Sequence, residues 1–473
     1  MDSARRVHRM QLTPNLPEAY QLLQDGILAF ARAEQEGMRI DVDYCLKKKE
    51  YLDKKIARLD RKLRDTKFYT HWTKVYGAKA NPDSNWQLAH LLYNVRKITP
   101  AKLTPSGKGA TDDEALSQID IPEIKWILEM RKLKKVRDTY LDAFIREQVG
   151  GYLHPFFNLH TVKTFRSSSE RINFQNIPKR DKEAMEITRK AIFPKPGHQL
   201  LEIDYSGVEV RISECYHHDP VMRKYIEDPS SDMHGDMACQ IFVLDKLDKS
   251  IPSHKMMRQA AKNGFVFPQF YGDYYVNCAE NIACKWCGLS KGKWKKGEGI
   301  EHDGGHISDH LIANKLDSFD KFTDHIKKIE DDFWNRRFKV YNRWKDKWWE
   351  GYQKNGYVSM YTGFRCSGIM RRNECINIPI QGSAFHCLLW SFIQVDKISR
   401  EQNWKSRLIG QIHDAMVLDV HPDELDMVAS TVHRITCEDL PKHWSWINVP
   451  LEVEAEICPV DCSWNEKGDY HFK

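Results

Sequence analysis

Two short apolar runs that each carry an aspartate constrain the fold of this chain most. The first run is Leu200-Leu201-Glu202-Ile203-Asp204, and the second extends from Leu408 to Leu418 with His413-Asp414 near its middle. Short apolar runs of this kind are typical of buried strands. If the first strand lies beside a hairpin that turns at His413-Asp414, we expect the two carboxylates to meet at one edge of a sheet.

A pair of carboxylates at one sheet edge can hold metal ions. Mg²⁺ prefers oxygen ligands, and two Mg²⁺ ions held ~4 Å apart stabilise the attacking and leaving oxygens of a phosphoryl transfer. A single aspartate at the end of a strand is more often structural. The metal interpretation therefore depends on the motifs around Asp204 and Asp414.

Further motifs surround the two aspartates between residues 164 and 420. They are Thr164-Phe165-Arg166 with Asn173-Phe174-Gln175-Asn176, the run from Asp204 to Arg211, Arg258-Gln259-Ala260-Ala261-Lys262 with Phe267 and Tyr271-Gly272, Asn377-Ile378-Pro379-Ile380-Gln381, and Ile412-His413-Asp414. In this order they resemble the polymerase motifs of family-A DNA polymerases. The resemblance implies an α+β fold with the architecture of a right hand, formed by a thumb, a palm with an antiparallel sheet and helical fingers.

The resemblance also divides the chain into parts. It implies an N-terminal arm and a helical thumb over residues 1–150, a palm over 151–218 and 352–473, and fingers over 219–351. The thumb would contain two helical segments rich in lysine and arginine, at 47–64 and 130–141. Helices of this kind contact phosphate and sugar, which positions a duplex without reading its sequence.

The function that the resemblance implies is template-directed extension of a primer 3′ end with dNTPs, with two Mg²⁺ ions. The metal ligands would be Asp204, Asp414 and the backbone carbonyl of Tyr205. The incoming nucleotide would be held by Arg258, Lys262, Phe267, Tyr271, Glu209 and His234. Primer-template DNA would be contacted by Arg166, Gln175, Asn176, Lys135, Asn377, Gln381 and His413. Glu209 would exclude ribonucleotides by crowding the 2′ position of the sugar.

Three palm positions depart from the family pattern, and one of them is Asn373, where an arginine is usual and Arg372 lies one residue early. Ala415 stands where many relatives carry a third carboxylate after the His-Asp pair, and Gly207 replaces a common glutamine. The metal chemistry would therefore depend on the two aspartates alone.

The fingers motif contains one residue more than the family pattern. Phe267 keeps its distance from Tyr271 but lies five residues after Lys262 instead of four. One added residue rotates a helix by ~100°, which would move Phe267 off the face that carries Lys262. We therefore expect a π-bulge near Gly264 and Pro268, with a kinked helix.

A Cys/His/Lys-rich insertion at about 278–310 does not follow the family pattern. Cys284-x2-Cys287 is followed after fourteen residues by His302-x3-His306, which is close to the spacing of a two-Cys two-His zinc site. Because buried unpaired thiols are common, ordinary packing of the cysteines is the alternative to zinc. The lysines between the two pairs would meet the template or a partner.

The composition indicates the cellular setting. The 12 cysteines occur without the apolar stretch of a signal peptide, and no run reaches the ~18 apolar residues of a membrane helix. We therefore expect a monomer in the cytoplasm, of the host if the chain is viral, with reduced thiols. The net charge of +6 indicates nucleic-acid binding only weakly, so the local charge of the helices carries more information.

The predicted N-terminal arm is too short for the proofreading exonuclease domain that precedes the thumb in many relatives. The chain in this respect resembles stand-alone bacteriophage polymerases. It would then depend on a separately encoded exonuclease and on other replication proteins.

Two other functions stay open. A single-subunit RNA polymerase shares the palm, but Glu209 and the thumb segments argue against it. An inactive primer-template binding module would explain Ala415. Such a loss of activity is opposed by the intact residues Asp204, Asp414, Arg258 and Lys262.

Overall fold

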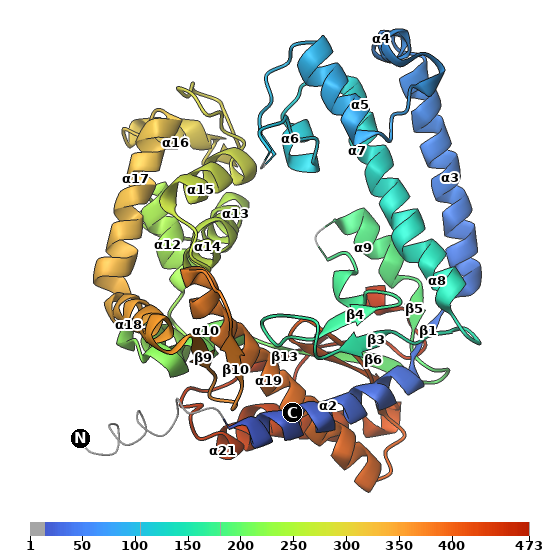
Figure 1. Ribbon diagram of the computed structural model, residues 1–473, viewed down its shortest axis with the longest axis vertical. Coiled ribbons are helices and arrows are strands. Elements are labelled where there is room, and N and C mark those ends of the chain that lie inside the picture. The colour runs from blue at the N-terminus through green and yellow to red at the C-terminus, as the bar shows by residue number, and fades with distance from the viewer. Residues whose placement is uncertain (1–14, 105, 180, 473) are drawn as a thin grey trace.

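The computed structural model describes residues 15–104, 106–179 and 181–472 and has the arrangement of an open right hand (Figure 1). A sheet with its helices forms the base, and two helical arms rise from it on opposite sides. The arm formed by residues 42–147 corresponds to the predicted thumb, and the arm formed by 219–355 to the predicted fingers. Base, thumb and fingers each have a buried apolar core.

The palm is built on a five-stranded antiparallel sheet. In spatial order its strands are β11 (Arg407–Ile412), β12 (Ala415–Val420), β6 (Gln199–Tyr205), β13 (Val453–Ile457) and β14 (Gly468–Tyr470). β6 lies at the centre and is buried on both faces, which explains why apolar residues occupy positions of both faces in Leu200, Leu201 and Ile203. Within it, Trp464 and Lys467 donate hydrogen bonds to the buried Glu202 carboxylate. Asp204 lies opposite Ala415 in the β6–β12 ladder, so the predicted pairing of the first strand with the hairpin is confirmed.

Helices pack against this sheet. They are α2 (Leu16–Glu36), α9 (Lys182–Arg189), α10 (Val208–His217), α19 (Arg372–Glu401), α20 (Leu425–Arg434), the π-helix η9 (Ile435–Asp439) and α21 (Leu440–His443). The Asn15 side chain caps α2, and Pro17 lies in its first turn. Ala29, Phe30 and Ala33 are buried where α2 packs on α19 and β11, so this helix belongs to the palm core and not to the thumb. Residues 1–14 of the predicted arm lie outside the described residues.

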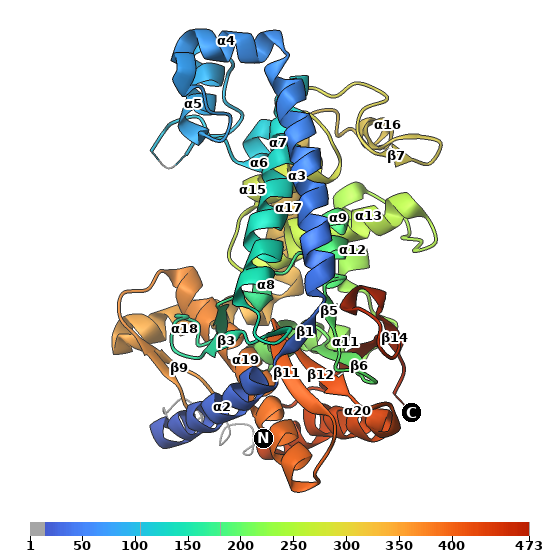
Figure 2. The ribbon, with the colours of Figure 1, turned by 90° about the vertical axis from the view of Figure 1, so that its right-hand side faces the viewer.

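The thumb consists of two long helical segments and a tip. The segments are α3 (Val42–Arg64) and the continuous α7 (Pro122–Lys135), π-helix η3 (Val136–Leu141) and α8 (Asp142–Glu147), which lie side by side (Figure 2). The tip contains α4 (Lys67–Tyr76), η1 (Gly77–Lys79), α5 (Asn85–Ala89), the π-helix η2 (His90–Val95) and α6 (Asp113–Ser117). A small sheet of β1 (Met38–Ile40), β2 (Tyr152–Leu153) and β5 (Ile192–Phe193) joins the thumb to the palm.

The fingers are almost entirely helical. Their helices are α11 (Pro220–Glu227), α12 (Met233–Phe242), α13 (Pro252–Ala261), η5 (Lys262–Val266), α14 (Phe267–Phe270), α15 (Tyr275–Glu280), η6 (Asn281–Trp286), α16 (Ile307–Ala313), α17 (Phe319–Asp332), η7 (Phe333–Arg337) and α18 (Lys339–Asn355). Phe265, Phe333 and Tyr341 are fully buried in their core.

The fingers helix contains the predicted bulge. α13, η5 and α14 follow one another without a break, and η5 is a π-helix. The wider turn absorbs the extra residue, because Lys262 Nζ lies 5.4 Å from the centroid of the Phe267 ring. A Cβ atom on Gly264 would come within 2.7 Å of Ile282 Cγ1. The glycine therefore lets the bulge pack closely against η6.

Short elements complete the fold. Three hairpins pair β3 (Phe156–Asn158) with β4 (Ser168–Glu170), β7 (Glu301–His302) with β8 (Gly305–His306), and β9 (Tyr357–Ser359) with β10 (Arg365–Ser367). The 3₁₀ turns of the palm are η4 (Phe174–Asn176), η8 (Pro422–Glu424) and η10 (Trp464–Glu466). Across the described ranges, no helix combines the length and the apolar composition that crossing a membrane requires.

Candidate active site

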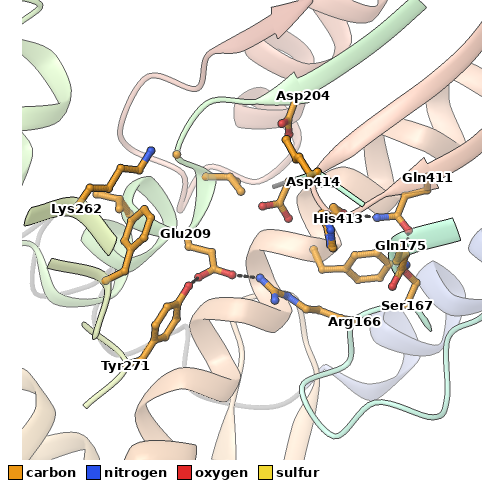
Figure 3. Close-up of a pocket in the computed structure, with 16 residues that line it drawn as sticks. Arg166, Ser167, Gln175, Asp204, Glu209, Lys262, Tyr271, Gln411, His413 and Asp414 are labelled. Atoms are coloured by element: carbon orange, nitrogen blue, oxygen red, sulfur yellow. Dashed lines mark hydrogen bonds and ion pairs between the residues drawn. The ribbon is translucent and has the colours of Figure 1, made fainter. Parts of the chain in front are cut away.

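A cavity of about 540 Å³ opens between the edge of the palm sheet and the fingers helix (Figure 3). Nine of the predicted site residues line it, namely Arg166, Gln175, Asp204, Glu209, Lys262, Phe267, Tyr271, His413 and Asp414. These residues come from separate segments of the palm and the fingers. The fold therefore brings most of the predicted site together in one place.

The sheet places Asp204 and Asp414 at the same edge. Asp204 is the penultimate residue of β6, and Asp414 lies in the two-residue turn between β11 and β12. His413 has a φ of +52°, a left-handed conformation that tight hairpin turns use. The Tyr205 amide donates a hydrogen bond to the Asp414 carbonyl at 3.2 Å, so backbone pairing continues up to the turn.

Burial beside the cavity raises the pKa of both aspartates. Burial, and then the negative charge of Asp414, raise the pKa of Asp204 to about 7. Burial also raises the pKa of Asp414, against the nearby positive charge of Arg166. Two half-buried carboxylates that repel each other favour a bound cation, and carboxylate oxygens are the ligands that Mg²⁺ prefers. The pair therefore fits the predicted Mg²⁺ site.

Glu209 connects the two walls of the cavity. The chain turns from β6 into α10 through Gly207, whose φ of +61° favours glycine, and Glu209 lies on the first turn of α10. The Tyr271 hydroxyl donates a hydrogen bond to Glu209 Oε2 at 2.6 Å. The guanidinium of Arg166 forms an ion pair with the other carboxylate oxygen (Figure 3). Glu209 is thus held from the fingers side and from the palm side.

Lys262 and Phe267 form the fingers wall of the cavity. Burial and the positive charge of Arg258 lower the pKa of Lys262. His234 packs edge-on against Phe267, with ring centroids 5.7 Å apart. Burial and the nearby charge of Lys262 lower the pKa of His234 to about 4. A desolvated lysine close to a second cation favours an anionic ligand.

Arg258 does not line the cavity. Its guanidinium donates to both carboxylate oxygens of Asp232, at 2.7 and 2.8 Å. Burial alone would raise the pKa of Asp232. The hydrogen bonds from Arg258, from Lys249 and from the Gly235 amide outweigh burial and hold this pKa well below its usual range. A nucleotide contact by Arg258 would therefore require the exchange of an internal partner.

Gln175 belongs to a polar network that reaches the hairpin turn. Its Nε2 donates to Ser167 Oγ at 2.8 Å and to Gln411 Oε1 at 3.0 Å. Ser167 Oγ also donates to Gln411 Oε1 at 2.7 Å, and Gln411 Nε2 donates to the His413 carbonyl. The network thus couples a predicted DNA contact to the turn that carries Asp414.

The remaining predicted DNA contacts lie outside the cavity. Asn377 and Gln381 line an adjoining crevice with Tyr271, and Asn377 Nδ2 donates to the Tyr271 carbonyl at 3.1 Å. Asn176 is exposed, and its carbonyl accepts a hydrogen bond at 2.6 Å from the tyrosine of the thumb helix η3. Lys135 is exposed at the end of α7.

Sequence reasoning missed several residues of the cavity lining. These are Ser167, Lys179, Gly207, Val208, Val210, Phe385 and Gln411. The sequence could have predicted Gln411, because it is a polar residue within an apolar strand and lies two positions before His413. Lys179 had no such signal because it lies in a loop without periodicity. Its positive charge nevertheless opposes the rise in the pKa of Asp204.

The structure does not assemble the predicted zinc site. Cys284 and Cys287 pack with the fingers core, and burial raises the pKa of the Cys287 thiol to about 12. His302 Nδ1 lies 3.2 Å from Ser253 Oγ, and His306 caps α16. Within the described ranges, no three His, Cys, Asp or Glu side chains are placed to hold a metal ion. The zinc prediction is therefore wrong, because apolar packing takes up the thiols.

The sequence matches a known family over most of its length. The profile of DNA polymerase family A matches residues 49–286 and 312–466, and the unmatched stretch 287–311 overlaps the predicted insertion. DNA polymerase I of Chloroflexus aurantiacus is 26% identical over 98% of this chain and 45% of its own length. Thermostable DNA polymerase I of Thermus filiformis is 26% identical over 90% of this chain and 46% of its own length. The chain thus spans less than half the length of these two relatives.

A solved structure has the same fold. The POL domain of Pol1 from M. smegmatis, in complex with DNA primer-template and dNTP, matches with a TM-score of 0.69 at 21% identity, over 93% of this chain and 70% of that one. This likeness confirms the predicted right-hand α+β fold. Since the family profile also spans the segments that carry Asp204, the fingers motif and Asp414, the chain belongs to DNA polymerase family A.

Proposed function

We propose that this chain is a template-directed DNA polymerase that extends a primer 3′ end with dNTPs. The observation that carries the proposal is the cavity in which Asp204 and Asp414 lie across from Lys262 and Tyr271 (Figure 3). The carboxylates on one wall can bind the metal ions that a phosphoryl transfer requires, and the lysine on the other wall can bind the negative charge of a triphosphate. The primer-template and dNTP named for the similar POL domain support the same class of substrates.

Asp204, Asp414 and the carbonyl of Tyr205 would hold two Mg²⁺ ions, which when bound supply positive charge to the transferring phosphoryl oxygens. The protein's own part is to place the reactants, because nucleotidyl transfer depends on positioning and electrostatics more than on covalent chemistry. Lys262 would bind the triphosphate as a point charge. Phe267 would lie against the sugar.

His234 and Arg258 of the fingers would not bind the triphosphate simply as free positive charges. With a pKa of about 4, His234 is neutral at physiological pH, so it would donate a hydrogen bond to a phosphate oxygen without adding charge. Arg258 would contribute only when a phosphate replaces Asp232 as its partner. Exchange of an internal carboxylate for the substrate would couple the position of α13 to nucleotide binding.

The palm side would hold the primer-template. Arg166, Gln175 and His413 line the cavity beside Asp414 and would contact the primer end and the minor-groove edge of the template. Hydrogen-bond acceptors in the minor groove are largely shared by all base pairs, so such contacts test pairing without selecting sequence. Asn377 and Gln381 would act from the adjoining crevice, and Asn176 and Lys135 from the loop and thumb.

A primer-extension assay tests the proposal directly. A labelled primer-template is incubated with Mg²⁺ and either dNTPs or rNTPs, and template-dependent extension with dNTPs is expected. Extension with rNTPs alone would identify the single-subunit RNA polymerase instead. Binding of the duplex without any extension would identify the inactive primer-template module.

A bacteriophage origin and reliance on a separate exonuclease stay predictions. The second is tested with a mismatched primer-template in the absence of dNTPs. The primer 3′ end should keep its length, and its shortening by the Asp204→Ala variant would show a nuclease site elsewhere in this chain.

A further inference from the structure

The thumb tip and the fingers meet at the end of the hand that lies away from the palm sheet (Figure 1 and Figure 2). Glu114 of the thumb-tip helix α6 forms an ion pair with Lys285 of η6 in the fingers, at 2.5 Å between Oε1 and Nζ. Thumb and fingers are already joined through the palm. This contact therefore closes the outline of the hand into a ring of protein.

The thumb side holds the Glu114 carboxylate in place. Glu114 lies in the first turn of α6, which the Asp112 side chain caps through a backbone amide at 2.9 Å. Leu116 of the same helix is fully buried in the core of the thumb tip. Lys102 donates to Glu114 Oε2 at 2.6 Å, and the hydrogen bonds from Lys102 and Lys285 lower the pKa of Glu114. The carboxylate is therefore ionised at neutral pH, with one oxygen towards its own tip and the other towards the fingers.

The fingers side holds Lys285 in a similar way. Lys285 lies in the last turn of η6, and Ile282 and Ala283 of this helix are fully buried in the fingers core. Ile282 also makes the close approach to Gly264 in the bulge η5. The ion pair thus connects the thumb tip to a helix that packs directly against the active-site helix of the fingers.

The pair is strong enough to form and weak enough to open. The side chains of Lys285 and Glu114 are 46% and 33% exposed. Ion pairs with this exposure contribute little free energy and are screened by salt. A duplex could therefore enter the hand while the pair is open and would be surrounded once it closes.

We propose that Glu114 and Lys285 form a clasp that encloses the primer-template duplex between thumb, palm and fingers and slows its dissociation. This inference rests on the proposed polymerase function. An enclosed duplex leaves only after the clasp opens or by sliding until one end passes through the ring. The clasp would thus retain the duplex without making any contact to the duplex itself.

The first test is Glu114→Gln, with the dissociation rate of a primer-template measured by stopped-flow fluorescence against excess competitor DNA. If overall charge alone mattered, the loss of a negative charge would slow dissociation from the polyanion. The clasp predicts the opposite, a rate about threefold faster at low salt, with a difference that disappears at about 0.5 M salt. Lys285 is kept, because it also lines a second cavity beside Tyr271, where its loss could act on nucleic acid directly.

The matched control is Asp113→Asn, which removes the same charge from the neighbouring residue. Asp113 is exposed in the first turn of α6 and forms no ion pair with any residue that the structure describes. This variant should leave the dissociation rate unchanged or slow it. Equal rates for Glu114→Gln and Asp113→Asn would overturn the clasp.

A second test asks whether the duplex is enclosed. The wild-type chain is bound to a gapped circular DNA, and a carbodiimide converts the ion pair into an amide between Glu114 and Lys285, which mass spectrometry of the peptides identifies. The linked protein should stay on the circle in about 1 M salt and leave once a restriction enzyme linearises the DNA. Glu114→Gln should not be retained. Failure to form the amide, or loss of the linked protein from the intact circle, would overturn the clasp.

Failure of the clasp can be told apart from failure of the polymerase function, because neither test contains dNTPs. Primer extension by a chain that is not retained on the circle would contradict only the clasp. Retention on the circle without primer extension would contradict only the polymerase function.

Discussion

The hydroxyl of Tyr271 donates a hydrogen bond to Glu209 Oε2 at 2.6 Å and thereby joins the fingers to the palm across the active-site cavity. Arg166 holds the other carboxylate oxygen. A carboxylate bound from two sides cannot move aside for an added substituent. This geometry supports a role for Glu209 in excluding a 2′-hydroxyl.

Glu209→Ala should admit ribonucleotides. Removal of the carboxylate opens space at the 2′ position, so the ratio of kcat/KM for a dNTP to that for its rNTP should fall by roughly a factor of a hundred, or about 2–3 kcal/mol. Single-nucleotide incorporation with both substrates measures this ratio. Tyr271→Phe is the control, because it keeps the carboxylate and removes one anchor. Its effect should be smaller, and an unchanged ratio in Glu209→Ala would leave Glu209 with a structural role only.

Asp204→Ala and Asp414→Ala should each abolish primer extension, by at least about a thousandfold. Binding of the primer-template should stay close to the wild-type value, because it depends on phosphate contacts of the thumb and palm. Gel-shift and extension assays on the same preparations measure both properties. Substantial extension by either variant would contradict the metal-ligand assignment.

Asp204→Asn should stabilise the metal-free chain in a pH-dependent way. The pKa of Asp204 is about 7 in the folded chain and ordinarily 3.8, so the folded state holds this proton more tightly. The resulting stability is fully present below about pH 4 and is lost as the pH rises through 7. In EDTA at about pH 8, the variant should therefore exceed the wild type by about 1–2 kcal/mol in the free energy of unfolding, after allowance for partial exposure.

Denaturant unfolding at several pH values checks this prediction. The advantage of Asp204→Asn should shrink as the pH falls from about 7 towards 4. A difference that stays the same across that range would show that burial does not perturb Asp204.

Gly264→Ala should destabilise the fingers. The added Cβ would lie 2.7 Å from Ile282 Cγ1, so η5 and η6 would have to separate, at a cost of about 1–3 kcal/mol in the free energy of unfolding. Gly292→Ala is the matched control, because no heavy atom lies within 4 Å of the position that its added Cβ would take. Denaturant unfolding of the two variants should separate them clearly, and equal stability would mean that the bulge does not depend on the close approach.

Phe267→Tyr should improve the incorporation of dideoxynucleotides by about tenfold, which corresponds to one hydrogen bond of about 1.4 kcal/mol. The π-bulge leaves Phe267 on the cavity wall, whereas Val266 is fully buried in the fingers core. A tyrosine hydroxyl at this place would replace the hydrogen bond that a dideoxynucleotide, which has no 3′-hydroxyl, does not form. Chain-termination ladders from the two proteins measure the change, and identical ladders would show that residue 267 does not face the sugar.

Local sequence pattern, together with the family resemblance, predicted much of the candidate active site. The apolar runs predicted the strand that carries Asp204 and the hairpin at His413-Asp414, because a strand that is buried on both faces of a sheet is rich in apolar residues. The count between Lys262 and Phe267, compared with the pattern of the family that the motif resembles, predicted the π-turn, because an extra residue in a helix must be absorbed within one turn. Both inferences depend on neighbours in the sequence.

Only the tertiary structure decided which distant groups meet. Arg258 forms an ion pair with Asp232 and therefore does not line the cavity. Cys287 is buried in the fingers core, and α2 packs into the palm core. Spacing along the chain cannot predict these outcomes, because each depends on a partner from another segment that competes for the same side chain. The sequence thus specified the elements and the motifs of the candidate site, while long-range packing selected the partners of each residue.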